Sequence, residues 1–192
     1  MSLEIVDFEL RAGVIAGLFV VTPKQITDER GTIRELFRRS AFEAAGVRLA
    51  AFQQINVTWS ACGVVRGMHA EQMTKLVTLA SGTAFGAYVD LRPESPTFRL
   101  VETIDLHPGV QVLVPAGVAN GFQALDLGCE YVYCFDAEWS PTISSKACTP
   151  LDPALEIAWP LPIDPTDPSQ ISAKDRDAPV LADIAHPEER ES

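Results

Sequence analysis

The sequence lacks a long apolar run and carries little positive charge. No stretch of 18 apolar residues occurs, so we expect no membrane span. Residues 1–4 show neither the basic segment nor the apolar core of a signal peptide, and we expect none. With 26 acidic and 15 basic side chains, the formal net charge is −11. Because so acidic a surface repels phosphate groups, we expect binding neither to nucleic acid nor to an anionic membrane.

Cysteine and histidine are too few and too scattered for the usual metal sites. The four cysteines form no CxxC pair, and the three histidines form no His-x-His pair. We therefore predict no bound metal, and reduced thiols in a cytoplasmic protein. The cysteines are Cys62, Cys129, Cys134 and Cys148.

The chain of 192 residues, 47% of them apolar, is long enough for one domain with a substantial core. Short apolar or alternating segments are separated by Gly, Pro, Asp or Ser, which is typical of a β-sandwich or barrel. We expect a mainly β fold with a few short helices, one of them at residues 40–45. The expected strands are 18–21, 32–37, 51–60, 64–69, 74–80, 84–91, 98–106, 111–114, 121–125 and 130–135.

The strand expected at 51–60 alternates polar and apolar residues, so its polar side chains share one face. The polar set is Gln54, Asn56, Thr58 and Ser60, and the apolar set is Ile55, Val57 and Trp59.

Proline is frequent from Pro141 onward, so regular structure is expected to be sparse there. This irregular segment still carries Leu155 and Trp159, and we expect it to wrap the core. We predict a single domain over 1–192 with its core at about 18–180, and fraying in the charged tail 186–192.

One stretch places three cationic or titratable side chains within ten residues of an acidic chain: Arg66, His69 and Lys75. A histidine can take up a proton near neutral pH, and neighbouring cations can stabilise an oxygen that becomes negative. This combination suits proton removal beside a carbonyl. The structural alternative is a core histidine flanked by solvated cations. Arg30 and Arg176 are further candidates for an anion-binding cluster.

A series of motifs from about residue 18 to residue 180 resembles the dTDP-4-dehydrorhamnose 3,5-epimerase family. The motifs, in order, are Asp28-Glu29-Arg30-Gly31, Gln54-x-Asn56, Arg66-Gly67-Met68-His69, Lys75-Leu76-Val77, Val89-Asp90-Leu91-Arg92 with Ser95-Pro96-Thr97-Phe98, Val114-Pro115-x-Gly117, Gly121-Phe122, Asp152-Pro153, Trp159-Pro160 and Ser172-Ala173-Lys174-Asp175. The resemblance implies a cupin-like jelly roll, a homodimer, no metal or redox cofactor, and a nucleotide-linked 4-keto-6-deoxy sugar as substrate.

The resemblance also implies roles for individual residues. His69 matches the base that removes the proton beside the keto group, and Asp175 matches its carboxylate partner. Lys75 matches the lysine that stabilises the enolate oxygen, and Tyr133 matches the tyrosine that returns a proton from the opposite sugar face. Tyr131 would share the face of Tyr133 and is its competitor.

Further matches concern substrate binding. Arg30 and Arg66 match contacts to the sugar diphosphate, for which a guanidinium fork is suited. Glu35, Gln54 and Asn56 match polar residues that line the cleft.

The chain departs from the family pattern at four places. Only five residues separate His69 from Lys75, Gly86 stands where members usually have Asp, Asn120 replaces a His, and Trp139 replaces a Tyr. These departures favour a relative that acts on another 4-keto sugar, or that inverts only one of carbons 3 and 5.

Three alternatives remain open on the sequence. A ketoisomerase on the same scaffold would enolise a keto sugar and move its carbonyl. A sugar-nucleotide-binding cupin would perform no catalysis. A metal-dependent cupin would need a ligand cluster that three histidines, with no His-x-His pair, do not supply.

Overall fold

The structure is a computed structural model that describes residues 3–140 and 145–184. The strands are β1 (Glu4–Val6), β2 (Glu9–Ala12), β3 (Phe19–Thr22), β4 (Gln25–Asp28), β5 (Gly31–Arg34), β6 (Gln54–Ser60), β7 (Val65–Glu71), β8 (Lys75–Asp90), β9 (Val101–Leu106), β10 (Gln111–Val114), β11 (Val118–Phe135) and β12 (Ser145–Ala147). The helices are α1 (Arg39–Ala44) and α2 (Ala173–Arg176), and the 3-10 turns are η1 (Pro153–Leu155) and η2 (Leu181–Asp183).

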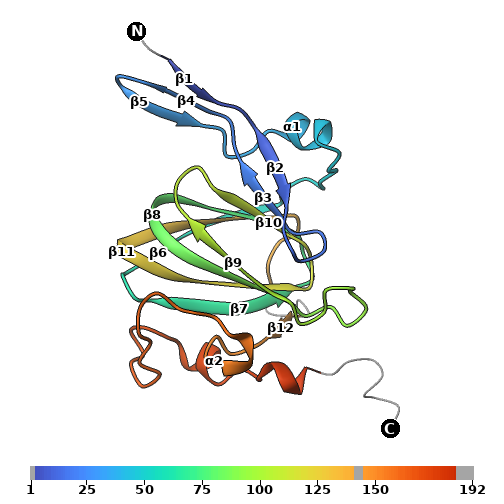
Figure 1. The fold of residues 1–192 in the computed structure, drawn as a ribbon, viewed down its shortest axis with the longest axis vertical. Coiled ribbons are helices and arrows are strands. Elements are labelled where there is room, and N and C mark those ends of the chain that lie inside the picture. The colour runs from blue at the N-terminus through green and yellow to red at the C-terminus, as the bar shows by residue number, and fades with distance from the viewer. Residues whose placement is uncertain (1–2, 141–144, 185–192) are drawn as a thin grey trace.

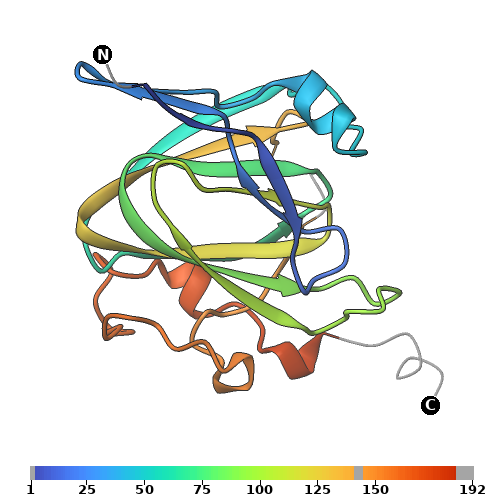
Figure 2. The same cartoon turned by 45° about the horizontal axis from the view of Figure 1, so that its top comes forward.

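Two long bent strands, β8 and β11, organise the fold (Figure 1). They pair with each other along most of their length, and each bends near its middle so that its two halves belong to different layers. The first half of β11 pairs with β7, and the second half pairs with β6. The second half of β8 pairs with β9, and the first half pairs with β10, beyond which lie β3 and β2. The result is the mainly β jelly roll that the sequence predicts, as Figure 2 shows from a second angle.

Several expected strands are present, but two pairs of them are joined. The segments expected at 74–80 and 84–91 are one strand, β8, and those at 121–125 and 130–135 are one strand, β11. The pairing resumes after the bend with Cys129 opposite Gly82, so the intervening residues bend the ladder and do not end it. The expected helix is α1, shifted by one residue. Strands β1, β2, β4 and β12 were not expected from the sequence.

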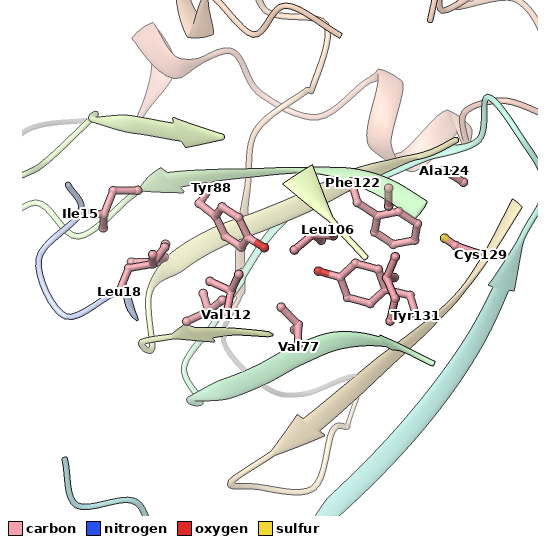
Figure 3. Packing of buried hydrophobic residues seen from close by; sticks show 14 residues of the cluster. Ile15, Leu18, Val77, Tyr88, Leu106, Val112, Phe122, Ala124, Cys129 and Tyr131 are labelled. Carbon is pink, nitrogen blue, oxygen red and sulfur yellow. The ribbon is translucent and has the colours of Figure 1, made fainter. Parts of the chain in front are cut away.

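The main core lies between the two layers of the jelly roll (Figure 3). It is built from inward-facing apolar side chains of β8, β10 and β11, together with the loop before β3. Tyr131 stacks on Phe122 with ring centroids 4.1 Å apart, and the hydroxyls of Tyr131 and Tyr88 point toward one another across this core.

The C-terminal segment wraps the outside of β7, as its apolar residues predict (Figure 1). Leu155 is buried, and the half-buried Trp159 donates its indole N–H to the Pro150 carbonyl at 3.0 Å. The Gln123 side chain exchanges two hydrogen bonds with the backbone of Leu161, both 2.9 Å long. These contacts fix the segment before it reaches α2. The expected fraying at 186–192 lies outside the described residues.

Strands β1, β4 and β5 form a separate three-stranded sheet, called the arm below, that projects beyond the jelly roll (Figure 1). Its apolar side chains Leu3, Ile5 and Ile33 are exposed, Ile33 by 73%. Strand β6 is also apolar on its outside, where Ile55 and Trp59 are each 64% exposed. Exposed apolar patches of this kind are typical of interaction surfaces.

Candidate functional site

Two adjoining cavities lie where β6, β7 and β11 meet the C-terminal segment. The larger, about 590 Å³, is lined by β6, β7 and residues 168–175, and the smaller, about 210 Å³, lies beside the start of β8. Four side chains line both cavities: Thr58, Arg66, His69 and Tyr133. A volume of this size suits a ligand larger than a single sugar ring.

His69 and Asp175 form the hydrogen-bonded pair that the resemblance implies. His69 comes from β7 and Asp175 from α2, and His69 Nε2 lies 2.7 Å from Asp175 Oδ1. The side chain of Asp175 is 8% exposed, whereas that of His69 is 33% exposed and faces the cavity. Burial tends to raise the pKa of Asp175, but its hydrogen bonds with His69 and with the Gly67 N–H outweigh burial and lower that pKa. The carboxylate therefore stays charged and can orient the imidazole.

Helix α2 delivers Asp175 through a side-chain cap. The Ser172 hydroxyl accepts a hydrogen bond from the Asp175 backbone N–H at 3.1 Å, as an N-cap residue does. The cap fixes the start of this four-residue helix against β7.

A close approach of two strands sets the position of His69. In the β7–β11 register His69 lies opposite Asn120, next to Gly121. A Cβ atom on Gly67 would lie 2.5 Å from Gly121 Cα, and Gly67 has φ +118°, a conformation that favours glycine. Glycine at both positions therefore lets β7 lie close enough to β11 for His69 to border the cavity.

Tyr133, not Tyr131, reaches the cavities. The two are on one face of β11 with ring centroids 4.7 Å apart, but Tyr131 is fully buried in the core. Tyr133 lines both cavities together with His69. Burial raises the pKa of Tyr133 well above its ordinary value, so its hydroxyl stays protonated and can donate.

Lys75 lies at the start of β8 and is almost completely buried, with 2% of its side chain exposed. Its ammonium donates to the Glu71 carboxylate at 2.6 Å, to the His69 carbonyl at 3.1 Å and to the Asn120 side-chain oxygen. Burial lowers the pKa of Lys75, while the Glu71 carboxylate acts in the opposite direction. Asn120, one of the departures from the family pattern, thus accepts a hydrogen bond from Lys75.

The polar face of β6 points to the cavities, whereas Ile55 and Val57 of its apolar set point outward and Trp59 borders the larger cavity. Asn56 and Thr58 line the smaller cavity, and Gln54 donates to Asn56 at 3.0 Å. Gln54 also accepts a hydrogen bond at 2.8 Å from the backbone of Trp139, whose ring lines the smaller cavity. Arg66 donates to the Ser60 hydroxyl at 2.9 Å and faces both cavities.

Three predicted binding residues lie elsewhere in this chain. Arg30 pairs with Asp28 on the arm, and Glu35 pairs with Arg38 just beyond it. Arg176, on α2, pairs with Asp177. None of the three lines either cavity in the part of the chain that the structure describes.

Two charged residues in the cavities were missed from the sequence. Glu71 lines the smaller cavity, and Lys174 lines the larger one. A usable signal for Glu71 was present, because residues two apart on a strand share a face and His69 lies two before it.

Local packing explains why Gly86 stands where members of the family usually have Asp. A Cβ atom on Gly86 would lie 2.9 Å from the Tyr88 hydroxyl and 3.0 Å from a Leu106 methyl group. Tyr88 fills this part of the core, so a larger residue at 86 would have to displace it.

No group of three or more His, Cys, Asp and Glu side chains within residues 3–140 and 145–184 could hold a metal ion. No helix in those ranges is long and apolar enough to cross a membrane.

The sequence profile described as dTDP-4-dehydrorhamnose 3,5-epimerase matches residues 13–183, nearly the whole chain. The chain belongs to the dTDP-4-dehydrorhamnose 3,5-epimerase family. The resemblance inferred from the motifs is therefore confirmed, and membership in this family places the protein among the isomerases.

Individual members of the dTDP-4-dehydrorhamnose 3,5-epimerase family are similar to this chain over most of its length. The dTDP-4-dehydrorhamnose 3,5-epimerase of Mycobacterium tuberculosis is 33% identical, covering 88% of this chain and 86% of its own. A 4-keto-6-deoxy sugar epimerase from the novobiocin gene cluster of Streptomyces spheroides superposes with a TM-score of 0.83 at 31% identity, covering 95% of this chain and 92% of that one. The Legionella pneumophila epimerase in complex with dTDP-4-keto-L-rhamnose gives a TM-score of 0.83 at 32% identity, covering 93% and 95%.

Proposed function

We propose that the protein is an epimerase that inverts carbon 3, carbon 5 or both in a dTDP-linked 4-keto-6-deoxy sugar, through an enolate and without a cofactor. The observation that carries the proposal is that His69, backed by Asp175, and Tyr133 line the same cavities. A site that inverts a carbon needs one group to remove a proton and another to return it from the opposite face. The Legionella relative, crystallised with a dTDP-linked keto sugar, supports the choice of substrate class.

The proton transfers balance in this scheme. The C–H bond beside the keto group breaks, its proton moves to His69 Nδ1, because Nε2 is hydrogen-bonded to Asp175, and the electron pair forms the enolate. The Tyr133 hydroxyl then gives its proton to the opposite face of the same carbon, which leaves a phenolate. Because burial raises the pKa of Tyr133, that phenolate recaptures a proton readily. Solvent returns both groups to their starting states.

Lys75 and Arg66 supply positive charge at two points of the cavities. The Lys75 ammonium borders the smaller cavity, where it stabilises the enolate oxygen. Arg66 faces both cavities and can hold a diphosphate oxygen with its fork of N–H groups. The larger cavity then takes the nucleotide end, with Lys174 as a second cation.

The deciding experiment incubates the protein with dTDP-4-keto-6-deoxyglucose in deuterated water and follows each carbon by proton NMR. Deuterium at carbon 3 or carbon 5 of an inverted sugar supports the proposal and identifies the carbon. Deuterium in a product whose carbonyl has moved identifies a ketoisomerase instead. A sugar that binds but stays unlabelled contradicts catalysis and leaves a binding protein.

We infer that the working unit is a homodimer. The arm and the outside of β6 expose apolar side chains that a partner subunit would cover, and a groove on the arm is lined by Ile26, Arg30 and Ile33. A dimer would also explain the positions of Arg30 and Glu35. Both match substrate contacts, yet they lie away from the cavities of their own chain.

Sedimentation equilibrium tests the homodimer. The wild type is expected to sediment as a dimer, and Ile33→Glu together with Ile55→Glu, two exposed residues that line neither cavity, as a monomer with the same far-UV circular dichroism. A monomeric wild type with full activity would contradict this assembly.

The state of the cysteines supports a cytoplasmic location. All four are free thiols, which fits a reducing compartment. Fractionation of the source cells, with the protein followed by antibody, would show it in the soluble intracellular fraction if the inference holds.

A further inference from the structure

Glu71 brings a second carboxylate to the cavities, on the side away from Asp175. It ends β7 two residues after His69, so both side chains project from the same face of the strand. Glu71 lines the smaller cavity with Lys75, Asn120 and Tyr133, and its side chain is only 13% exposed. Nothing in the proposed proton transfers uses it.

The hydrogen bonds of the Lys75 ammonium indicate what Glu71 does. An ammonium has three N–H donors, and Lys75 directs them to Glu71 Oε2, to the Asn120 side chain and to the His69 carbonyl. Glu71 is the only one of these three acceptors that carries a charge. The ammonium is therefore neutralised and aimed by a side chain that itself borders the cavity.

We propose that Glu71 is a positioning residue for the reaction, which holds the Lys75 ammonium charged and directed at the place where the enolate oxygen forms. The inference rests on the proposed function, because it assigns to that reaction a residue that works through Lys75. The longest of the three contacts, 3.1 Å to the His69 carbonyl, is the one that a substrate oxygen can replace. The pair with Glu71 persists during that exchange.

The burial of both groups explains why a charged partner is needed. Desolvation disfavours the charged form of each, and their mutual attraction is the largest effect that opposes it; for Glu71 a backbone hydrogen bond and His69 add smaller effects. Without the carboxylate, a lysine this deeply buried loses its proton at lower pH. A neutral amine would then stand where the reaction needs a cation.

The test is the pH profile of kcat/KM for deuterium exchange in the wild type and in Glu71→Gln. Glutamine keeps the size of the side chain and an acceptor oxygen but removes the charge. Because an opposite charge at this distance shifts a pKa by about 1 to 3 units, we expect the alkaline limb to move to lower pH by about that much. At pH 6 the variant should retain activity within a few-fold. An alkaline limb at the wild-type position would overturn the proposal.

Two further variants keep the test decisive. Glu130→Gln, on an exposed part of β11 where the carboxylate accepts a hydrogen bond from Ser81, removes a carboxylate of the same size and should leave the profile unchanged. Glu71→Asp keeps the charge and should keep the position of the alkaline limb even if the rate falls. If Glu71→Gln does not fold, a shifted limb in Glu71→Asp would overturn the proposal.

A double-mutant cycle asks whether Glu71 acts through Lys75. In a Lys75→Met background the Glu71→Gln substitution should cost nothing further, because the ammonium is already gone. An equal cost in both backgrounds would mean that Glu71 acts by itself and would contradict a positioning role.

A substrate-free measurement separates this inference from the proposed function. In protein labelled with 15N-lysine, the side-chain nitrogen of Lys75, assigned through Lys75→Met, should titrate at lower pH in Glu71→Gln than in the wild type. If the wild type exchanges no deuterium, the proposed function fails, and this titration still decides whether Glu71 holds the charge of Lys75. Identical titrations would overturn the inference.

Discussion

Two hydrogen-bonded pairs border the cavities, one built on His69 and one on Lys75, and they differ in origin and in exposure. On one side His69 Nε2 lies 2.7 Å from Asp175, which is 106 residues away in the chain. On the other, Lys75 Nζ lies 2.6 Å from Glu71, only four residues away. The imidazole is 33% exposed, whereas the lysine side chain is 2% exposed.

The difference in exposure suits two different roles: His69 transfers a proton, and Lys75 holds a fixed positive charge. The partly exposed imidazole can meet a C–H bond and later release its proton, whereas the buried ammonium is held by three acceptors and stays in place. Two of the four family departures, Asn120 and the short connection between β7 and β8, lie beside Lys75. Changes in substrate preference are therefore expected there, and changes in rate on the His69 side.

The largest effect is expected from His69→Ala. Loss of the base should slow deuterium exchange by about 10³-fold, because general-base catalysis contributes roughly 10² to 10⁴. NMR of the deuterated substrate measures it. His107→Ala removes an exposed histidine that lines neither cavity and serves as the matched control. Exchange at the wild-type rate in His69→Ala would remove His69 from this role.

Tyr133→Phe should separate inversion from exchange. Without the hydroxyl, inversion should fall by about 10²-fold, while His69 still exchanges the proton on its own face at close to the wild-type rate. The two rates come from one NMR time course that follows label and stereochemistry together. Tyr131→Phe removes the neighbouring hydroxyl, which lies in the core, and so tests whether it matters which of the two hydroxyls is lost. Equal loss of both rates in Tyr133→Phe would indicate a packing defect.

Asp175→Asn should have a smaller effect on exchange, about 10- to 100-fold, because the imidazole stays but loses the charge that orients it. The pH dependence of the free energy of unfolding gives a second measurement of the pair. Its folded-state pKa is lowered, so its contribution to stability is present above the unfolded value of about 3.9 and is lost as pH falls through the folded value. Urea unfolding between pH 5 and pH 2 should therefore show a weaker pH dependence in the variant. An unchanged slope would argue that the pair does not persist in solution.

Asn120→Asp should have the smallest effect at neutral pH, a few-fold at most. It places a second carboxylate beside Lys75, which raises the pKa of the lysine and moves the alkaline limb of the exchange profile to higher pH. The shift is opposite in sign to that expected for Glu71→Gln. A shift in the same direction would show that the limb does not report Lys75.

The sequence indicates the fold class well but not the course of the long strands. Alternation and turn residues locate β6, β7, β9 and β10 to within a few residues. The small residues around Gly82 and Gly128 look like turns, but there β8 and β11 bend together and keep their pairing. A local pattern does not distinguish a turn from a shared bend, because the difference depends on a partner strand far along the chain.

The site is predictable from the sequence where a motif carries it and less so where the fold alone creates it. His69, Asp175, Lys75 and Tyr133 line the cavities or contact residues that do. Glu71 belongs to none of the motifs, and only its place two residues after His69 on one strand face indicates it. Only the tight connection between β7 and β8 turns it toward Lys75.

Arg30 and Glu35 show a different limit of prediction. Their motif matches substrate contacts, but it does not specify which copy of the chain they serve. The structure puts them on and beside the arm, outside the cavities of their own chain. Their predicted role therefore depends on a partner subunit and stays a prediction.

The wrapping of the C-terminal segment has a consequence for how activity is gained and lost. Asp175 reaches His69 only after the chain has crossed the largely exposed stretch 162–169, which contains little regular structure. The jelly roll can therefore be complete while the imidazole still lacks its acid. Proteolytic cleavage in this stretch is therefore expected to lower activity more than it lowers the stability of the jelly roll.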